Sequence, residues 1–352
     1  MSRQITRNGD RSLREFLLSN LSTQRLSLIL LPTEQCNFRC TYCYEDFALK
    51  KMNRSVVSGI KQLVTKRAPG LSALDLAWFG GEPLLAKDVV LDISSLAQDL
   101  ARAHPELIYT GGMTTNAYLL DGALARRLAA VGVRNYQISL DGPGSIHDAT
   151  RRRRDGQGTF DRIWRNLIEL GKSDLDIALS LRVHVQPSNH EHLPVLVSEL
   201  AREFAADQRF SVVFRVVGDW GGPNTGSIAV LNREHAIATV AHLESQWRQA
   251  RGGNENALER YTQNTTAPFV CYASKPNSFI IRSNGDIGKC TVVLKDSRNR
   301  IGRINEDGTM EVDRKLLALW MQGFRSFDLE TLACPAEKLP KLLAIESPAP
   351  SA

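Results

Sequence analysis

The sequence Cys36-Asn37-Phe38-Arg39-Cys40-Thr41-Tyr42-Cys43-Tyr44 places three cysteines at C-x3-C-x2-C spacing on one short segment. The apolar run 26–31 precedes it and predicts a buried strand, which Pro32 ends because proline has no backbone donor. Cysteine thiolates are the usual protein ligands of iron–sulfur clusters. Three thiolates on one loop can each bind one iron of a cubic 4Fe–4S cluster. The fourth iron is then left without a ligand from this loop.

A zinc site, or three thiols grouped by chance, is the alternative explanation. Structural zinc sites usually pair C-x2-C units and need a fourth nitrogen or sulfur ligand. No further cysteine or histidine lies close to this segment in the sequence. The spacing therefore favours an iron–sulfur cluster.

The composition is that of an ordinary soluble globular protein, with 43% hydrophobic and 23% charged residues among 352. We find no signal peptide and no apolar run near the ~18 residues of a membrane span. The net charge of +6 is mild and requires no nucleic acid partner. Six cysteines in two groups of three form a poor disulfide framework, so we expect a reducing cytoplasm and no membrane association.

The cysteine loop, with an aromatic residue after its last cysteine, resembles the cluster loop of the radical S-adenosylmethionine (SAM) enzymes. The resemblance implies that Cys36, Cys40 and Cys43 hold a 4Fe–4S cluster whose open iron chelates the amino and carboxylate groups of SAM. An electron from a donor such as flavodoxin or ferredoxin would then split SAM. The resulting 5′-deoxyadenosyl radical abstracts a hydrogen atom in that family.

Predicted strands and helices alternate through the first two thirds of the chain. Parallel strands need crossover connections, so this alternation predicts a parallel sheet. The best fit, which is also the fold that the resemblance implies, is α/β: a partial (β/α)6 TIM-like barrel with a small C-terminal α+β auxiliary iron–sulfur domain. The predicted strands are 26–31, 74–79, 107–115, 136–140, 177–185 and 210–217, and the predicted helices are 54–67, 88–104, 121–131, 159–170 and 192–204.

Short motifs follow these strands, at the edge where α/β barrels carry their chemistry. Gly80-Gly81-Glu82-Pro83 matches the G-G-E-P element that hydrogen-bonds the SAM amino group in the family, although alone it also fits an ordinary turn. Thr115-Asn116 matches the third-strand T-N, with Ala117 in place of the usual glycine. Ser139-Leu140-Asp141-Gly142 resembles the fourth-strand element that contacts the ribose and positions SAM.

The signature continues through residue 161 in a pattern typical of members that modify peptides and proteins. Within it, Arg151 is the candidate partner for the SAM carboxylate, because a guanidinium binds a carboxylate with two parallel hydrogen bonds. The alternative is a solvated charge in the basic run 151–154. As a general base we name Asp219, on its position alone.

Three further cysteines, Cys271, Cys290 and Cys334, lie in the last third of the chain. Between the first two, Asn284-Gly285 predicts a two-residue hairpin within 278–289. This region resembles the auxiliary-cluster domains called SPASM and twitch, which usually carry seven and four cysteines. Three cysteines leave room for one auxiliary cluster, of the 4Fe–4S type that the resemblance implies. Its open iron would take Glu337, the candidate fourth ligand, or water or a substrate group. Three inert buried thiols are the alternative.

We divide the chain into an N-terminal extension (1–25), a radical SAM partial barrel (26–220), a helical linker (221–265), an auxiliary domain (266–345) and a disordered tail (346–352). The signature predicts a maturase that crosslinks or similarly oxidises a ribosomally made precursor peptide. The peptide would lie in the open side of the barrel, by addition to an exposed strand edge.

Because only 35 residues precede the first cysteine, we expect leader recognition by the barrel surface, including the basic run, or by a separate small protein. Three other functions remain open. A sulfatase-maturase-like enzyme forming formylglycine shares the motifs but carries seven auxiliary cysteines. A radical SAM dehydrogenase of a small molecule is the second. The third, an iron–sulfur electron carrier, would have no use for the SAM motifs.

Overall fold

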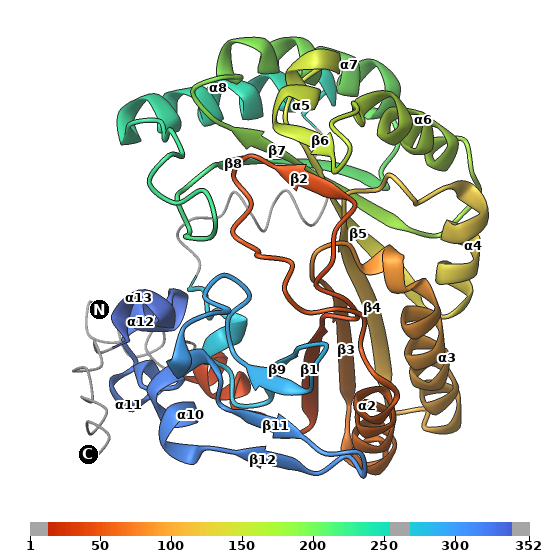
Figure 1. Ribbon diagram of the computed structural model, residues 1–352, viewed down its shortest axis with the longest axis vertical. Helices are drawn as coiled ribbons and strands as arrows, with labels where there is room; N and C mark the ends of the chain where they lie inside the picture. The colour runs from red at the N-terminus through yellow and green to blue at the C-terminus, as the bar shows by residue number, and fades with distance from the viewer. Residues whose placement is uncertain (1–12, 254–267, 340–352) are drawn as a thin grey trace, which may run out of the picture.

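The computed structural model describes residues 13–253 and 268–339. The predicted tail and parts of the predicted extension, linker and auxiliary domain lie outside these residues. The described part is built on a ten-stranded sheet of order β12-β11-β10-β9-β1-β3-β4-β5-β7-β8. In Figure 1 this sheet curves as an arc around an open interior, with helices on its outer side.

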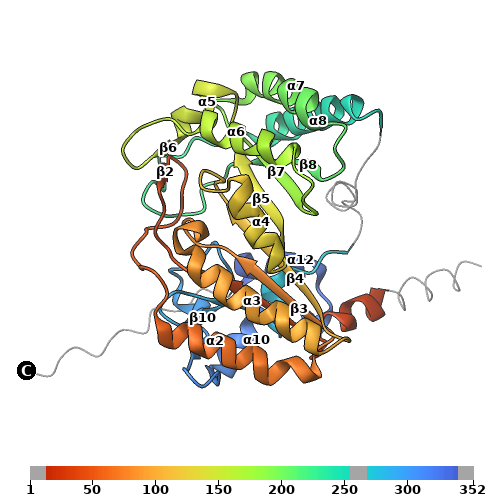
Figure 2. The same cartoon turned by 90° about the vertical axis from the view of Figure 1, so that its right-hand side faces the viewer.

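Six parallel strands form the barrel wall, which confirms the predicted fold class. They are β1 (Arg25–Leu30), β3 (Ala73–Trp78), β4 (Ile108–Thr115), β5 (Val133–Leu140), β7 (Ala178–Val185) and β8 (Phe210–Val216). The outer helices are α2 (Arg54–Arg67), α3 (Lys87–Ala103), α4 (Gly122–Ala130), α6 (Phe160–Gly171) and α7 (Leu193–Phe204). Figure 2 shows the same helices stacked along the outer face of the strands.

The helices begin where a polar side chain can accept a free backbone N–H. Asn53 accepts from the N–H of Val56 at the start of α2, and Asp121 accepts from Leu124 at the start of α4. Their buried faces pack on strands that are apolar along most of their length, as expected for a parallel sheet covered by helices.

The cysteine loop crosses the open side of the barrel and is paired with a segment far away in sequence (Figure 1). Its β2 (Phe38–Cys40) is antiparallel to β6 (Arg151–Arg153), with Cys40 opposite Arg151. The helix α5 (Gly144–Thr150) leads into β6. Part of the basic run is therefore a strand that holds the cysteine loop. Its pairing is nonlocal, and the local sequence carries no strand signal for it.

The C-terminal part continues the barrel sheet. β9 (Ser278–Ile281) is parallel to β1, and β10 (Asp286–Gly288), β11 (Gly302–Ile304) and β12 (Met310–Val312) follow as antiparallel neighbours. Arg282 also forms an ion pair with the buried Glu34, which precedes the first cysteine.

The structure has a hairpin at Asn284-Gly285, but the predicted loop length of two residues is wrong. Three residues separate the paired residues Arg282 and Asp286: the N–H of Arg282 donates to the carbonyl of Asp286, and the N–H of Gly285 donates back to the carbonyl of Arg282. Gly285 adopts a φ of 89°. A third loop residue at positive φ is typical of the bulged three-residue hairpin. The Asn-Gly dipeptide fits this loop as well, because it places glycine at the position of positive φ.

After β8 the chain forms a long helix, α8 (Arg233–Ala250), which lies against β8. It packs on α7, and the side-chain amide of Gln246 donates to the carbonyl of Pro194 at 2.9 Å.

None of the described helices has the length and apolar character needed to cross a bilayer. The short elements are α10 (Arg314–Trp320), α11 (Gly323–Ser326), α12 (Leu329–Ala333), α13 (Pro335–Lys338) and 3-10 turns at Ala68–Gly70, Pro83–Ala86, His190–His192, Tyr272–Ser274 and Ser297–Asn299.

Candidate active site

A cavity of about 410 Å³ lies between the cysteine loop and the carboxyl ends of the barrel strands. Most of the residues singled out from the sequence are in its wall. They are Cys36, Cys40, Cys43, Gly80, Gly81, Thr115, Asn116, Ser139 and Arg151. Glu82, Pro83, Asp141 and Asp219 are not among the residues that line it.

The three loop cysteines are free thiols that face this common cavity. Burial, with a smaller contribution from the neighbouring Cys40, raises the pKa of the Cys43 thiol to about 12. A metal cation reverses this effect, because a coordinating thiol loses its proton. In the described residues, no three Cys, His, Asp or Glu side chains lie close enough together to coordinate one metal ion. Binding of a cluster would therefore move the three thiols closer to one another. Three convergent thiols fit a 4Fe–4S cluster with one open iron.

Two glycines after β3 let the strand end approach the cysteine loop. A Cβ on Gly80 would lie 2.3 Å from the carbonyl oxygen of Thr33, and one on Gly81 would lie 2.5 Å from that of Gln35. Gly80 also has a φ of 117°, a conformation that favours glycine. The motif therefore sets the position of the backbone that leads into Cys36.

The Glu82 side chain turns away from the cavity and joins two strand ends. It is fully buried, and its carboxylate accepts hydrogen bonds from the N–H of Leu84, the hydroxyl of Thr115 and the N–H of Asn116, at 2.8–3.0 Å. Burial raises its pKa although these donors oppose the shift. Only the backbone carbonyl groups of this motif remain to face a bound amine.

The Thr115-Asn116 element also holds the structure together. The Asn116 amide donates to the Asn37 side chain at 2.8 Å, which ties β4 to the cysteine loop. Ala117 has a φ of 59°. This left-handed conformation explains why glycine is the usual residue here in the family that the motif resembles.

Asp141 lies at the centre of a buried hydrogen-bond network. The Tyr42 hydroxyl donates to its carboxylate at 2.9 Å, and Nδ1 of His184 lies 3.0 Å from the same oxygen. The Thr150 hydroxyl donates to the other oxygen at 2.6 Å. Burial alone would raise the pKa of Asp141, but the His184 hydrogen bond and the Arg151 charge hold it well below its usual range.

Sequence reasoning missed Tyr42 and His184, although both line the cavity. Their positions carried a signal: Tyr42 lies within the cysteine loop, and His184 is the penultimate residue of the fifth parallel strand. Burial lowers the pKa of His184, although Asp141 opposes the shift. The geometry thus gives His184 a position at the cavity wall that Asp219 lacks.

Arg151 is 7% exposed, which excludes the solvated-charge alternative. One guanidinium nitrogen donates to the Tyr42 hydroxyl at 2.9 Å, while its Nε is buried without a hydrogen-bond partner among the described residues. A buried, incompletely paired guanidinium in the wall of the thiol-lined cavity is the group expected to bind a carboxylate.

Asp219 lies on an exposed loop after β8. Its carboxylate accepts from the N–H groups of Gly221 and Gly226 and from the hydroxyl of Thr225, and these bonds lower its pKa. This geometry favours a loop-ordering role over that of a general base.

The three C-terminal cysteines form a second thiol group. Burial raises the pKa of Cys271, and the charges of Cys290 and Cys334 add to the shift. Burial also raises the pKa of Cys334, and the Glu337 carboxylate contributes through its charge and a side-chain hydrogen bond. Three thiols with one adjacent carboxylate suit the ligand set of a single cluster.

Residues 30–200 match the profile of the radical SAM superfamily. The chain contains a radical SAM domain. The GTP 3′,8-cyclase of Paenarthrobacter nicotinovorans is 36% identical to it over 129 residues, which is 36% of this chain and 32% of that protein. The PqqA peptide cyclase of Xanthomonas campestris pv. campestris is 25% identical over 304 residues, covering 85% of this chain and 74% of that protein. The chain spans only 42% and 32% of the first two curated relatives it matches.

Solved structures share the fold beyond the radical SAM domain. The enzyme anSMEcpe with bound AdoMet and the Kp18Cys peptide aligns with a TM-score of 0.65 at 20% identity, over 88% of each chain. Streptococcus suis SuiB bound to its precursor peptide SuiA aligns with a TM-score of 0.57 at 18% identity, over 94% of this chain and 74% of SuiB. At these identities the likeness concerns the fold.

Proposed function

We propose that this radical SAM protein abstracts a hydrogen atom from a ribosomally synthesised precursor peptide and installs a crosslink or a related oxidative modification. The observation that carries the proposal is that two cavities adjoin inside the barrel. The thiol-lined cavity shares wall residues with a second one of about 850 Å³ inside the barrel. Together they give a polypeptide segment room to reach the cofactor site from the barrel interior.

In this proposal Cys36, Cys40 and Cys43 hold the 4Fe–4S cluster, and Arg151 pairs with the SAM carboxylate. When bound, the cluster and SAM would supply the radical that abstracts hydrogen. Backbone carbonyl groups at 80–82 would accept hydrogen bonds from the SAM amino group, and Ser139 would face the ribose. Tyr42, Asp141 and His184 fix the orientation of Arg151 and close the wall behind it.

The auxiliary region would complete the enzyme. Cys271, Cys290 and Cys334 are the proposed ligands of one auxiliary iron–sulfur cluster, with Glu337 as the candidate fourth ligand. The domain division, an external donor such as flavodoxin or ferredoxin, and a reducing cytoplasmic setting belong to the same proposal. The six free cysteines of the described residues support the setting.

The sheet restricts how a peptide can enter. β9 pairs with β1 and occupies that edge of the barrel, whereas β8 is the last strand on the other side. We therefore place strand addition by the substrate at β8. Proteins named for peptide substrates or bound to peptides, namely PqqA peptide cyclase, SuiB and anSMEcpe, share the fold or the sequence pattern and support this substrate class.

A sulfatase-maturase-like activity is the second candidate, because the anSMEcpe fold covers 88% of this chain. It also acts on a polypeptide and uses the same cavity. The presence of three auxiliary cysteines, where that subgroup carries seven, favours the first proposal.

The test uses short peptides encoded next to this gene. Anaerobically reconstituted protein, SAM and a strong reductant are incubated with each peptide, and products are read by mass spectrometry. We expect deoxyadenosine formation to rise and the peptide to lose two hydrogens. Intact SAM cleavage without any peptide mass change would contradict the proposal and favour sulfatase-type or small-molecule substrates.

A further inference from the structure

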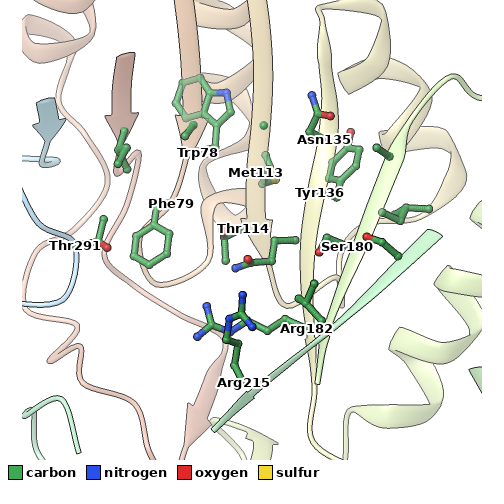
Figure 3. Close-up of a pocket in the computed structure, with 18 of the residues that line it drawn as sticks. Trp78, Phe79, Met113, Thr114, Asn135, Tyr136, Ser180, Arg182, Arg215 and Thr291 are labelled. Carbon is green, nitrogen blue, oxygen red and sulfur yellow. The ribbon is translucent and has the colours of Figure 1, made fainter. Parts of the chain in front are cut away.

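Two arginines from neighbouring strands meet inside the barrel. Arg182 lies on β7 and Arg215 on β8, where the aligned partner of Arg182 is Val213, two residues before Arg215. Residues two apart on a strand share a face, so both side chains project to the same side of the sheet. Figure 3 shows the two guanidinium groups converging at the end of the cavity, beside Phe79 and Thr114.

These arginines mark the boundary between the two cavities. Both line the barrel cavity and also the thiol-lined one. The other residues common to both walls are uncharged: Phe79, Thr114, Gln137 and Thr291. A group held by the pair would therefore stand at the entrance from the barrel interior to the cofactor site.

The positive charge of this pair is not neutralised within the described part of the chain. Neither arginine forms an ion pair there, and Nε of Arg182 is buried without a hydrogen-bond partner. Among the described residues, the Arg215 guanidinium donates one hydrogen bond, to the carbonyl of Phe214 at 2.9 Å. Burial and the charge of Arg215 lower the pKa of Arg182, yet an arginine stays protonated in proteins.

A carboxylate in the same cavity wall, Glu45, forms no ion pair with either arginine in the described part of the chain, and burial raises its pKa to about 8. Two other buried carboxylates are committed to other partners. Glu82 is bonded to Leu84, Thr115 and Asn116, and Asp141 to Tyr42, Thr150 and His184. Holding two like charges together in a partly buried site is unfavourable unless an anion joins them. Arginine forks match the planar shape of a carboxylate.

We propose that Arg182 and Arg215 together bind a carboxylate of the substrate polypeptide at the boundary of the two cavities. This inference rests on the proposed function, since it names the chemistry by which that substrate is positioned. The carboxylate comes from an acidic side chain or from the peptide C-terminus, and the pair would hold the neighbouring carbon atoms next to the cofactor site. Arg151 remains assigned to the SAM carboxylate.

The test measures binding without turnover. Reconstituted full-length protein with SAM, and no reductant, is titrated by saturation-transfer NMR with three probes: N-acetyl-glutamate α-amide, its glutamine counterpart, and N-acetyl-alanine with a free carboxylate. We expect at least one carboxylate probe to bind at least about tenfold more tightly than the glutamine probe, because charge-assisted hydrogen bonds are lost. The better of the two carboxylate probes identifies the source.

The variants Arg182→Gln and Arg215→Gln should each abolish this preference while SAM affinity stays within about twofold, because the proposal assigns the SAM carboxylate to Arg151 and not to this pair. The matched control is Arg127→Gln, which removes the same charge from the exposed face of α4 and should change nothing. Urea unfolding of each variant verifies folding, and the exposed Arg215 gives a usable variant if Arg182→Gln is unstable.

Two results would overturn the proposal. One is equal binding of the glutamate, glutamine and alanine probes. The other is a loss of SAM affinity in the Arg182 and Arg215 variants that matches the loss in Arg151→Gln, which would assign the pair to SAM itself. Because no reductant is present, probe binding is independent of peptide modification. The two proposals can therefore fail separately.

Discussion

Arg151 connects the cysteine loop to the proposed SAM site through a single side chain. It is buried opposite Cys40, and one of its nitrogens already binds Tyr42. We predict that Arg151→Gln weakens SAM binding at least about tenfold, because a charge-assisted carboxylate pair is worth roughly 1.5–3 kcal/mol. Equilibrium dialysis of the reconstituted protein with SAM measures the change.

Arg152 provides the control for Arg151, because it is the next residue of the same strand and is exposed. Arg152→Gln removes an equal charge outside the cavity and should leave SAM affinity unchanged. Equal losses in both variants would mean that the basic run acts through its overall charge, and the assignment of Arg151 would be wrong.

We predict that His147 gives the protein a pH-dependent stability. Burial, opposed by the charge of Asp141 and aided by that of Arg151, lowers its pKa from the usual 6.5 to about 4. Between these values the unfolded chain binds a proton that the folded one excludes, so stability rises with pH across this window and falls on acidification. The full difference is about 3 kcal/mol.

The measurement compares urea unfolding of the wild type and His147→Gln at pH 7, 5.5 and 4.5. We expect the wild type to lose more stability than the variant as the pH falls. The same pH dependence in both proteins would show that His147 is not the titrating group.

The sequence predicts the residues whose spacing is local and fails for those that only the fold brings together. The three loop cysteines, Ser139 and Arg151 were found from motifs, and all of them line the cavity. Arg182 and Arg215 belong to no motif. Their relation depends on the register of two parallel strands. The orientation of the Glu82 side chain was also beyond prediction, because two of its three partners, Thr115 and Asn116, come from the end of the neighbouring strand.

At the scale of elements, the cysteine loop is positioned by close backbone contacts. Gly222, on the loop after β8, has a φ of 94°, and a Cβ there would lie 2.4 Å from the Cα of Tyr44. Gly221 has a similar φ of 89° but open space around it. The two glycines therefore separate the effect of contact from the effect of backbone strain.

We predict that Gly222→Ala displaces the loop next to Cys43 and lowers both iron content and SAM binding. Gly221→Ala should cost only backbone strain, about 1–2 kcal/mol of stability, and keep its iron. Iron analysis and visible absorption after anaerobic reconstitution test both variants. Equal iron loss in the two would contradict a specific contact between Gly222 and the cysteine loop.

Elements with strong periodicity were predicted well, and elements made by nonlocal pairing were not. The helices and parallel strands lie within a few residues of the predicted bounds, because each buries its own apolar pattern. In contrast, β2 and β6 have three residues each and exist only because they pair with each other. The hairpin loop length was likewise set by the pairing of β9 with β10.

At the scale of the whole molecule, the predicted barrel and auxiliary regions share one sheet. Ser27 pairs with Ser278 across the β1–β9 junction, and Ile29, Leu31 and Ile280 pack there as one buried cluster. No local pattern predicts a pairing over such a separation in sequence. The division into domains stays a prediction, and we expect the junction to couple the stability of the two parts.

We predict that Ile280→Ala lowers the free energy of unfolding of both regions together, by about 2–5 kcal/mol. Hydrogen exchange in urea, followed at β4 and β11, should show the same shift in both. Ile237→Ala on α8 is the control: its side chain is 61% exposed, and the expected change is within about 0.5 kcal/mol. A shift confined to β11 would show that the auxiliary region unfolds independently.

The account depends first on a SAM-cleaving cluster at Cys36, Cys40 and Cys43. The most direct measurement is 5′-deoxyadenosine formation by anaerobically reconstituted protein with SAM and a strong reductant. We predict that the wild type forms deoxyadenosine and methionine, and that the variant with all three cysteines replaced by alanine forms none while retaining its auxiliary iron. Deoxyadenosine formation by the triple variant would contradict the account at its centre.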